Sequence, residues 1–192
     1  RAIPMLPERL SHDLCSLRPD VPRLAQGLAI DYDAKGRVRG VEFRDAVIRS
    51  AARMTYDEVQ EILDEGPSAA TDRPPRVVRM IERAGSLAKL LEGRRRRRGA
   101  VDLDMPAPEP VLGDDGDVVD VVPSQRTDAT KLIEEFMIAA NEAVARRLLE
   151  DGVPTLYRVH ERPPWDRAAK LARILDGLGY DLPGDPSRLG PA

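Results

Sequence analysis

The sequence predicts an α+β fold in which hairpins of a mixed or antiparallel sheet are packed by amphipathic helices. Three observations support this. The chain has 192 residues, of which 42% are hydrophobic, so it can bury a core and is not disordered throughout. Runs rich in β-branched residues are bounded by turn signals, and four other segments repeat apolar residues at three-and-four spacing. Strands and helices alternate irregularly, so a regular βαβ series is not expected.

The N-terminal part is predicted to form one hairpin. Residues 1–7 contain two prolines and suit an extended edge segment, whereas residues 10–17 fit a helical turn or a strand equally well. Residues 26–48 have the pattern of a β-hairpin, with Gly36 at a positive φ in its turn. Gly40 marks a bulge or a close backbone approach.

Two helices are predicted next. A short helix over residues 53–63 begins at Thr55 or Asp57, residues that cap helix N-termini well. Residues 66–75 have loop composition and are expected to form a mobile loop. The second helix covers residues 77–91, where apolar side chains recur along one face.

The second half contains the strongest helical pattern of the chain. Residues 129–148 carry a continuous apolar stripe, which makes this segment the expected core helix, opened by Thr127 or Asp128. Two strand-like runs precede it. The remaining expectations are strands over 100–104 and 117–122 around an Asp-Asp-Gly turn, a strand over 156–160, a helix over 165–178 capped by Gly179, and a connector or frayed tail at 181–192.

Composition limits the classes of function. With 30 Lys and Arg against 33 Asp and Glu, the formal charge is -3, so any nucleic-acid surface must be local. No apolar run reaches transmembrane length and no leader-like segment opens the chain, which predicts a protein without membrane partners. A single cysteine, Cys15, favours a reducing compartment, and the cytoplasm is expected. His12, Cys15 and His160 are too few for an ordinary zinc site, but carboxylate-bound Mg²⁺ or Mn²⁺ is compatible with the sequence.

Two groups of acids are candidates for metal binding, because two-metal hydrolysis needs converging carboxylates. Asp102 and Asp104 would share one side of a strand, and Asp114, Asp115 and Asp117 crowd a turn. The first pair fits the solvated face of an edge strand equally well, and the trio fits ordinary turn chemistry better. Neither group by itself specifies a site.

The predicted core helix offers a candidate binding flank. Glu134 lies seven residues before Asn141, so both side chains lie on one flank, where they could bind sugar hydroxyls or a base. A solvated helix flank is the alternative, and Glu135 and Glu142 repeat the same spacing.

The run of five arginines directly after Gly93, where the second helix is predicted to end, is a candidate phosphate patch. A solvated helix end that complements the helix dipole is an equally good interpretation of Arg94, Arg95, Arg96, Arg97 and Arg98. Aromatic residues that could stack on bases are scarce. His160 has no nucleophile motif nearby, so a catalytic triad is unsupported and a structural histidine is favoured.

Six stretches, taken in order, resemble the catalytic domain of the RNB exoribonucleases, the ribonuclease II and ribonuclease R family. Their order and approximate spacing are kept from the first residue to about residue 180. Any one of them is a weak signal, but six in register are a strong one. They are Ile3–Glu8, Leu14–Leu17, Ser50–Tyr56, Arg98–Asp102, Leu132–Asn141 and Leu156–Glu161.

This resemblance implies an enzyme that degrades single-stranded RNA from its 3′ end and releases nucleoside 5′-monophosphates. It implies clustered aspartates that hold Mg²⁺ and an arginine that stabilises the developing charge. Tyr56 matches a family tyrosine near the cleavage site, and Glu134 matches a glutamate that binds the terminal nucleotides. Leu103 stands where the family has a phenylalanine that clamps the last bases, and a leucine offers no π-face for stacking.

Two family features are not found in this sequence. The aspartate cluster belongs upstream of the Pro4–Pro7 segment, and the catalytic arginine belongs downstream of the last helix. Residues 1–180 are therefore expected to be the central part of an RNB catalytic domain, inactive as a nuclease when isolated. The alternative, motivated by Leu103, is a non-catalytic RNA-binding or scaffold relative of the family.

Overall fold

The computed structural model describes residues 3–70, 72–101, 108–113, 115–123, 126–159 and 163–180. These residues form helices and two separate two-stranded antiparallel sheets, which confirms the predicted α+β class. In chain order the elements are a π-helix η1 (Arg9–Leu14), β1 (Pro22–Tyr32), β2 (Val38–Arg49), α1 (Tyr56–Glu65), a 3-10 helix η2 (Gly66–Ala70), α2 (Pro75–Arg97), β3 (Pro108–Leu112), β4 (Val118–Pro123), α3 (Asp128–Glu150) and α4 (Trp165–Gly177).

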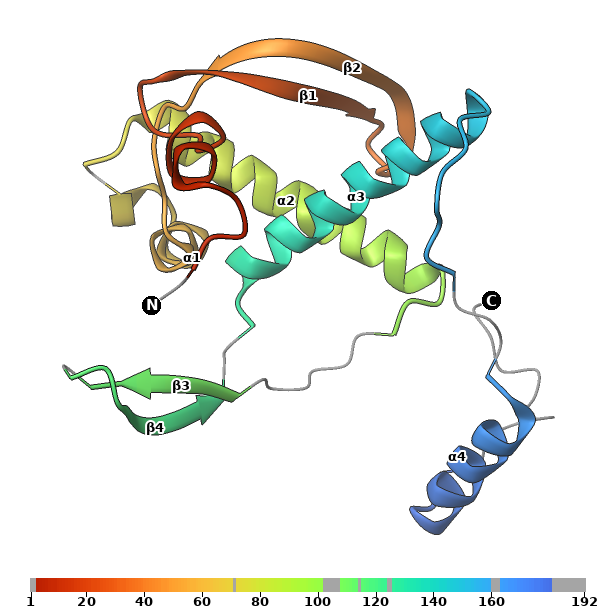
Figure 1. Cartoon of the computed structure of the whole chain (residues 1–192). Helices are drawn as coiled ribbons and strands as arrows, with labels where there is room; N and C mark the ends of the chain where they lie inside the picture. The colour runs from red at the N-terminus through yellow and green to blue at the C-terminus, as the bar shows by residue number, and fades with distance from the viewer. Residues whose placement is uncertain are drawn as a thin grey trace.

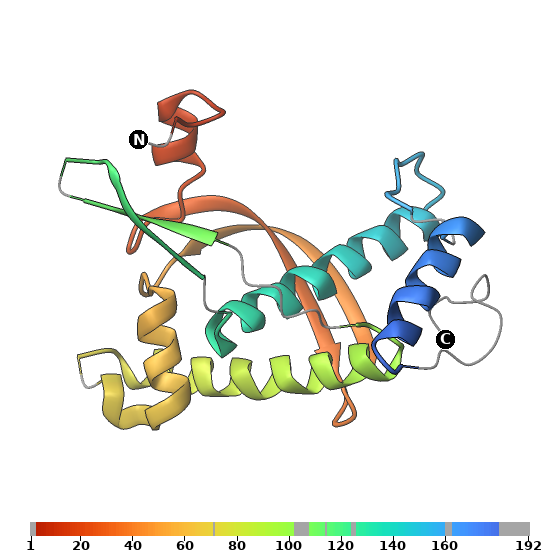
Figure 2. The same cartoon turned by 90° about the horizontal axis from the view of Figure 1, so that it is seen from below.

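The arrangement is centred on two long helices that cross. Figures 1 and 2 show α2 and α3 crossing, with the long β1–β2 hairpin arching over one side of the pair and α1 lying beside their N-terminal halves. The β3–β4 hairpin and α4 stand apart from this crossing in Figure 1. The crossed helices therefore form the frame on which the candidate site residues are placed.

The β1–β2 hairpin agrees with the sequence prediction. Its strands pair from Pro22 opposite Arg49 to Tyr32 opposite Val38, and Gly36 has φ +70° in the connecting turn. The register shifts by one residue at the Asp31–Tyr32 step, next to Gly40, so the predicted bulge is confirmed.

The tip of this hairpin is held by the C-terminal half of α2. Arg94 donates a hydrogen bond to the carbonyl oxygen of Gly36. Asp33 fixes the turn from inside, because its carboxylate accepts from the backbone N–H groups of Lys35 and Arg37, both at 2.9 Å. A two-stranded hairpin is marginal alone, so this contact is an important anchor.

Replacing Gly36 by alanine is expected to destabilise the chain by about 2–4 kcal/mol, since the positive φ and the lack of space both penalise a side chain. A Cβ atom there would lie 3.0 Å from Leu90 Cγ and from Arg94 Cδ. Gly116 is the matched control, because it has φ +86° but nothing within 4 Å. Urea unfolding should show the larger loss for Gly36→Ala; equal losses would mean that the contact with α2 adds nothing.

The small core lies where α1 meets α2. Ile62 is 1% exposed and packs with Val77, Val78 and Ile81 of α2, as the apolar spacing predicts. Thr55 caps α1 through a capping box with Glu58, and Thr127 caps α3. Of the two caps that the sequence offered for each helix, the structure thus selects the threonine.

The structure corrects several predicted boundaries. Helix α2 does not end near Gly93 but continues to Arg97, because arginine favours helices and Arg96 pairs with Glu92 one turn earlier. The segment expected to be a loop begins with η2, in which Ser68 Oγ donates to the carbonyl of Glu65. The ambiguous segment at 10–17 is helical up to Leu14, where η1 ends.

The strand predictions are corrected as well. The strand paired with β4 is Pro108–Leu112, not the run predicted at 100–104. Residues 153–159 form no strand, since no described segment pairs with them. Residues 3–7 are not in a strand either. Predictions that fall on residues 102–104, 114, 160 and 181–192 lie outside the described residues.

Much of the apolar surface is left uncovered. The chain exposes 15666 Å², whereas a compact monomer of this mass exposes about 9,000 Å². The predicted core stripe of α3 is only half buried: Leu132 is 6% exposed, but Ile133, Met137 and Val144 are exposed by 42%, 59% and 41%. The predicted core helix is therefore buried along one side only, because α1 and α2 pack against that side and the described part of the chain leaves the other side open.

Candidate nucleic-acid interface

The arginine run forms the last turn of α2 and its C-cap, and two of its members, Arg95 and Arg98, bond to α3. Four of its members are bonded to protein groups, which occupy some of the five N–H donors of each guanidinium. A role in phosphate binding stays a prediction. The pairs are Arg94 with the Gly36 carbonyl, Arg95 with Glu135, Arg96 with Glu92 and Arg98 with Glu142. Arg97 is exposed.

A network of alternating charges joins the end of α2 to α3. Arg95 Nη2 lies 2.7 Å from Glu135 Oε1 and 3.9 Å from Glu134 Oε1. Glu135 is buried, with 4% of its surface exposed, whereas the side chain of Glu134 is 41% exposed. Arg126, just before α3, donates to both carboxylate oxygens of Glu134, at 2.9 and 2.7 Å. Glu134 is thus half-exposed and held by an arginine.

Tyr56 begins α1, and α1 is tied directly to the start of α3. Gln60, one turn after Tyr56, accepts a hydrogen bond of 3.0 Å from the backbone N–H of Ala129. This bond satisfies one of the free donors at the α3 N-terminus. It places Tyr56, which is 52% exposed, and Glu134 on the adjoining ends of two contacting helices.

The N-terminus of α1 is expected to loosen in acid. The backbone N–H of Thr55, together with the guanidinium of Arg73, lowers the pKa of Glu58. The ionised Glu58 side chain therefore stabilises the helix fully above the ordinary glutamate pKa of about 4.3. This stabilisation is lost as the pH falls through the lowered pKa of Glu58. Between about pH 6 and about pH 3, the melting temperature should fall less in Glu58→Gln than in the unsubstituted chain. Glu61→Gln, on the same helix, serves as control; if it behaves like Glu58→Gln, the capping box is not the cause.

Asn141 is exposed on the same flank of α3 as Glu134. Between them lies Met137, and the flank faces away from the packed side of the helix. It combines a carboxylate, an amide and apolar surface, which are the groups that bind sugars and bases. Leu103, the third residue predicted to contact nucleotides, lies outside the described residues.

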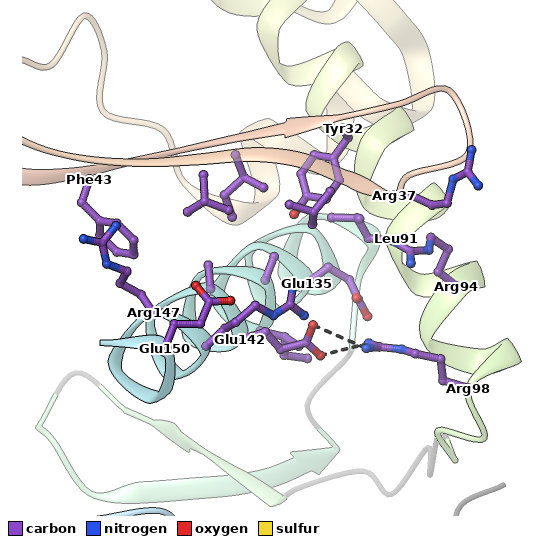
Figure 3. A pocket seen from close by; sticks show the side chains of 17 residues that line it. Tyr32, Arg37, Phe43, Leu91, Arg94, Arg98, Glu135, Glu142, Arg147 and Glu150 are labelled. Atoms are coloured by element: carbon purple, nitrogen blue, oxygen red, sulfur yellow. Dashed lines mark hydrogen bonds and ion pairs between the residues drawn. The ribbon is translucent and has the colours of Figure 1, made fainter. Parts of the chain in front are cut away.

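A cavity of about 400 Å³ lies on the opposite side of α3, beneath the β1–β2 hairpin (Figure 3). Tyr32 and Phe43 of the hairpin face it, and Glu142 and Arg98 close its far side with a 3.0 Å ion pair. Burial raises the pKa of the Tyr32 hydroxyl, and the Glu142 carboxylate raises it further. No pattern in the sequence indicates this cavity, since residues distant in the chain line it.

Within the ranges that the structure describes, no group of three or more His, Cys, Asp or Glu side chains is placed to hold a metal ion. Asp115 and Asp117 belong to these ranges, while Asp102, Asp104 and Asp114 do not. None of the described helices is both long enough and apolar enough to cross a bilayer.

The sequence does not directly indicate a role for Arg126, the pairing of Arg95 with Glu135 or the burial of Glu135. One signal is present for Glu135, because it follows Leu132 by three positions and therefore borders the apolar stripe of α3. A carboxylate buried at the edge of such a stripe indicates a partner of opposite charge. Nothing in the sequence identifies Arg126, which reaches Glu134 from outside the helix.

The sequence model of the RNB domain matches residues 1–188 of the chain. The chain belongs to the RNB domain family. The resemblance predicted from six short motifs is thereby confirmed over nearly the whole sequence, and the fold predicted as a partial RNB catalytic domain is consistent with the structural relatives.

Similar proteins in this family are named ribonuclease R. Ribonuclease R of Aquifex aeolicus is 39% identical over 182 residues, covering 95% of this chain and 26% of that protein. Ribonuclease R of Thermotoga maritima is 41% identical over 178 residues, covering 92% of this chain and 25% of that protein. The structure of Mycoplasma genitalium RNase R in complex with ribose methylated single-stranded RNA superposes with a TM-score of 0.86 at 31% identity, covering 92% of this chain and 27% of that one. The RNB chain thus spans about a quarter of the length of these relatives.

Proposed function

We propose that this chain is the central part of a 3′-to-5′ exoribonuclease that hydrolyses single-stranded RNA to nucleoside 5′-monophosphates. The observation that carries the proposal is the RNB match over residues 1–188. The name ribonuclease R of its relatives and the single-stranded RNA bound by one of them support it. We call the full-length protein that contains this chain the parent protein and expect it in the cytoplasm, without membrane partners.

The chain's part in this reaction is to bind the substrate. The half-exposed Glu134 carboxylate accepts hydrogen bonds from the terminal nucleotides, and Asn141 offers an amide seven residues further along the same flank. Tyr56, at the adjoining end of α1, contacts the RNA with its ring. Arg94–Arg98 at the end of α2 supply positive charge for phosphates, and Leu103 packs against a base.

Mg²⁺ is expected to take part in the parent protein, where it would activate water and stabilise charge on the phosphate. The described residues do not fit this ion, because they hold no cluster of metal-binding side chains. Following the resemblance to the family, the proposal assigns the metal ligands to the part of the parent protein upstream of the Pro4–Pro7 segment and the catalytic arginine to the part downstream of the last helix.

The proposal is tested with the parent protein and the isolated chain side by side. The substrate is a single-stranded RNA labelled at its 5′ end, incubated with Mg²⁺. The parent protein should shorten the RNA from the 3′ end and release nucleoside 5′-monophosphates, while the isolated chain should leave it intact. Metal-dependent decay by the purified chain would contradict this division of labour.

The alternative is a non-catalytic RNA-binding or scaffold relative. A parent protein that binds the RNA in a salt-dependent manner but never shortens it would establish this alternative. Reading the parent sequence upstream of Arg1 for clustered aspartates distinguishes the two at once, since only the enzyme needs them.

A further inference from the structure

The Glu134 carboxylate is approached by two arginines, but only one of them holds it. Arg126 Nη2 lies 2.9 Å from Oε1 and 2.7 Å from Oε2, which are charge-assisted hydrogen bonds. Arg95 Nη2 lies 3.9 Å from Oε1, beyond hydrogen-bond distance. Arg95 is instead paired with Glu135, to whose Oε1 its Nε donates at 2.8 Å while its Nη2 lies 2.7 Å from the same oxygen.

Arg126 is well placed to fix the Glu134 side chain. It lies directly before Thr127, whose hydroxyl caps α3 by accepting from the Thr130 backbone N–H. The cap sets the direction from which the chain enters α3. The guanidinium of Arg126 therefore extends along the first two turns of the helix to Glu134. The Arg126 side chain is 28% exposed, less than that of Glu134 at 41%.

The contact leaves Glu134 able to bind a ligand. A carboxylate has about four lone-pair sites, and the two bonds from Arg126 leave about half of them for other donors. A free glutamate side chain has several rotamers, and ordering it on binding costs affinity. A side chain already held in one place avoids that cost.

We propose that Arg126 is a positioning residue that holds the Glu134 carboxylate ready to accept hydrogen bonds from the RNA. The inference rests on the proposed function, because it takes Glu134 to contact the terminal nucleotides. It adds a residue that acts through Glu134 and does not itself bind RNA. An ordinary surface ion pair would contribute to stability alone and have no effect on substrate binding.

The test is a double-mutant cycle in the parent protein with Arg126→Ala, Glu134→Ala and both together. The measurements are KM and kcat on single-stranded RNA and the melting temperature. Arg126→Ala should raise KM about 5- to 10-fold, and the double variant should match Glu134→Ala alone. Arg147→Ala is the control, since it removes a similar pair, 2.6 Å from Asp151, at the far end of α3.

Three outcomes would overturn the inference. If Arg126→Ala changes KM and kcat on RNA by the same factor in the unchanged protein and in the Glu134→Ala variant, Arg126 acts on its own, for instance on a phosphate. If Glu134→Ala impairs RNA use but Arg126→Ala does not, the positioning role fails while the proposed function stands. If Glu134→Ala has no effect, the assignment of Glu134 as a nucleotide contact fails, and the role of Arg126 fails with it. Should Arg126→Ala not fold, the same cycle is run with Arg126→Gln. The effects of Arg126→Gln and Glu134→Ala on KM are again expected to be non-additive, and additive effects would contradict the inference.

Discussion

Replacing Arg95 by alanine is expected to destabilise the packing of α2 against α3 by about 3–5 kcal/mol, because it leaves a buried carboxylate without its partner. The side chains of Arg95 and Glu135 are 17% and 5% exposed, and Arg95 Nη2 lies 2.7 Å from Glu135 Oε1. The loss corresponds to at least about 100-fold faster hydrogen exchange in the two helices of the parent protein, at about 1.4 kcal/mol for each factor of ten.

Two variants test the cause of this effect. Arg96, one residue after Arg95 in α2, has an exposed side chain that pairs with the partly buried Glu92, and Arg96→Ala should cost at most about 1 kcal/mol. Replacing Arg95 by methionine and Glu135 by leucine together should recover most of the stability, since no unpaired charge then remains. Equal exchange in Arg95→Ala and Arg96→Ala would show that burial of the pair is unimportant.

The second large effect is expected on function, from Glu134→Ala in the parent protein. A hydrogen bond to a charged group contributes about 1.5–3 kcal/mol, so kcat/KM on single-stranded RNA should fall about 10- to 100-fold. The kcat/KM of Glu134→Gln should lie between those of Glu134→Ala and the unchanged protein, because the amide oxygen still accepts a hydrogen bond but carries no charge.

The matched control is Glu150→Ala, which removes an exposed carboxylate from the last turn of the same helix. It should leave kcat/KM within about 2-fold of the unchanged protein, since surface substitutions away from a site have small effects. If Glu134→Ala and Glu150→Ala have the same kcat/KM, the flank that carries Glu134 does not contact RNA.

Local patterns allowed much of the fold to be predicted. The hairpin followed from a turn with Gly36, and the caps Thr55 and Thr127 followed from residue type and position. These features depend on a few neighbouring residues. The sequence places the end of α2 at Gly93, four residues too early, because glycine is a poor helix former, whereas this helix continues through glycine where its neighbours form side-chain pairs.

Contacts between distant residues could not be predicted. The partners of Glu134 and Glu135 come from a preceding loop and from another helix, and periodicity carries no information on them. The strand at 156–160 was predicted from composition, but a strand needs a pairing partner, and none of the described segments supplies one for residues 156–159. The resemblance to a family, rather than the pattern of α3, distinguished Glu134 from Glu135.

The most direct test of the account is to find where the 3′ end of an RNA lies on the parent protein. A single-stranded RNA with 4-thiouridine as its last nucleotide is bound without Mg²⁺, cross-linked by light and mapped by mass spectrometry. Cross-links are predicted at the start of α1, around Tyr56, and on the α3 flank between Glu134 and Asn141, and they should be absent when 4-thiouridine is at the 5′ end. Cross-links that fall only outside residues 1–192 would contradict the claim that this chain binds the terminal nucleotides.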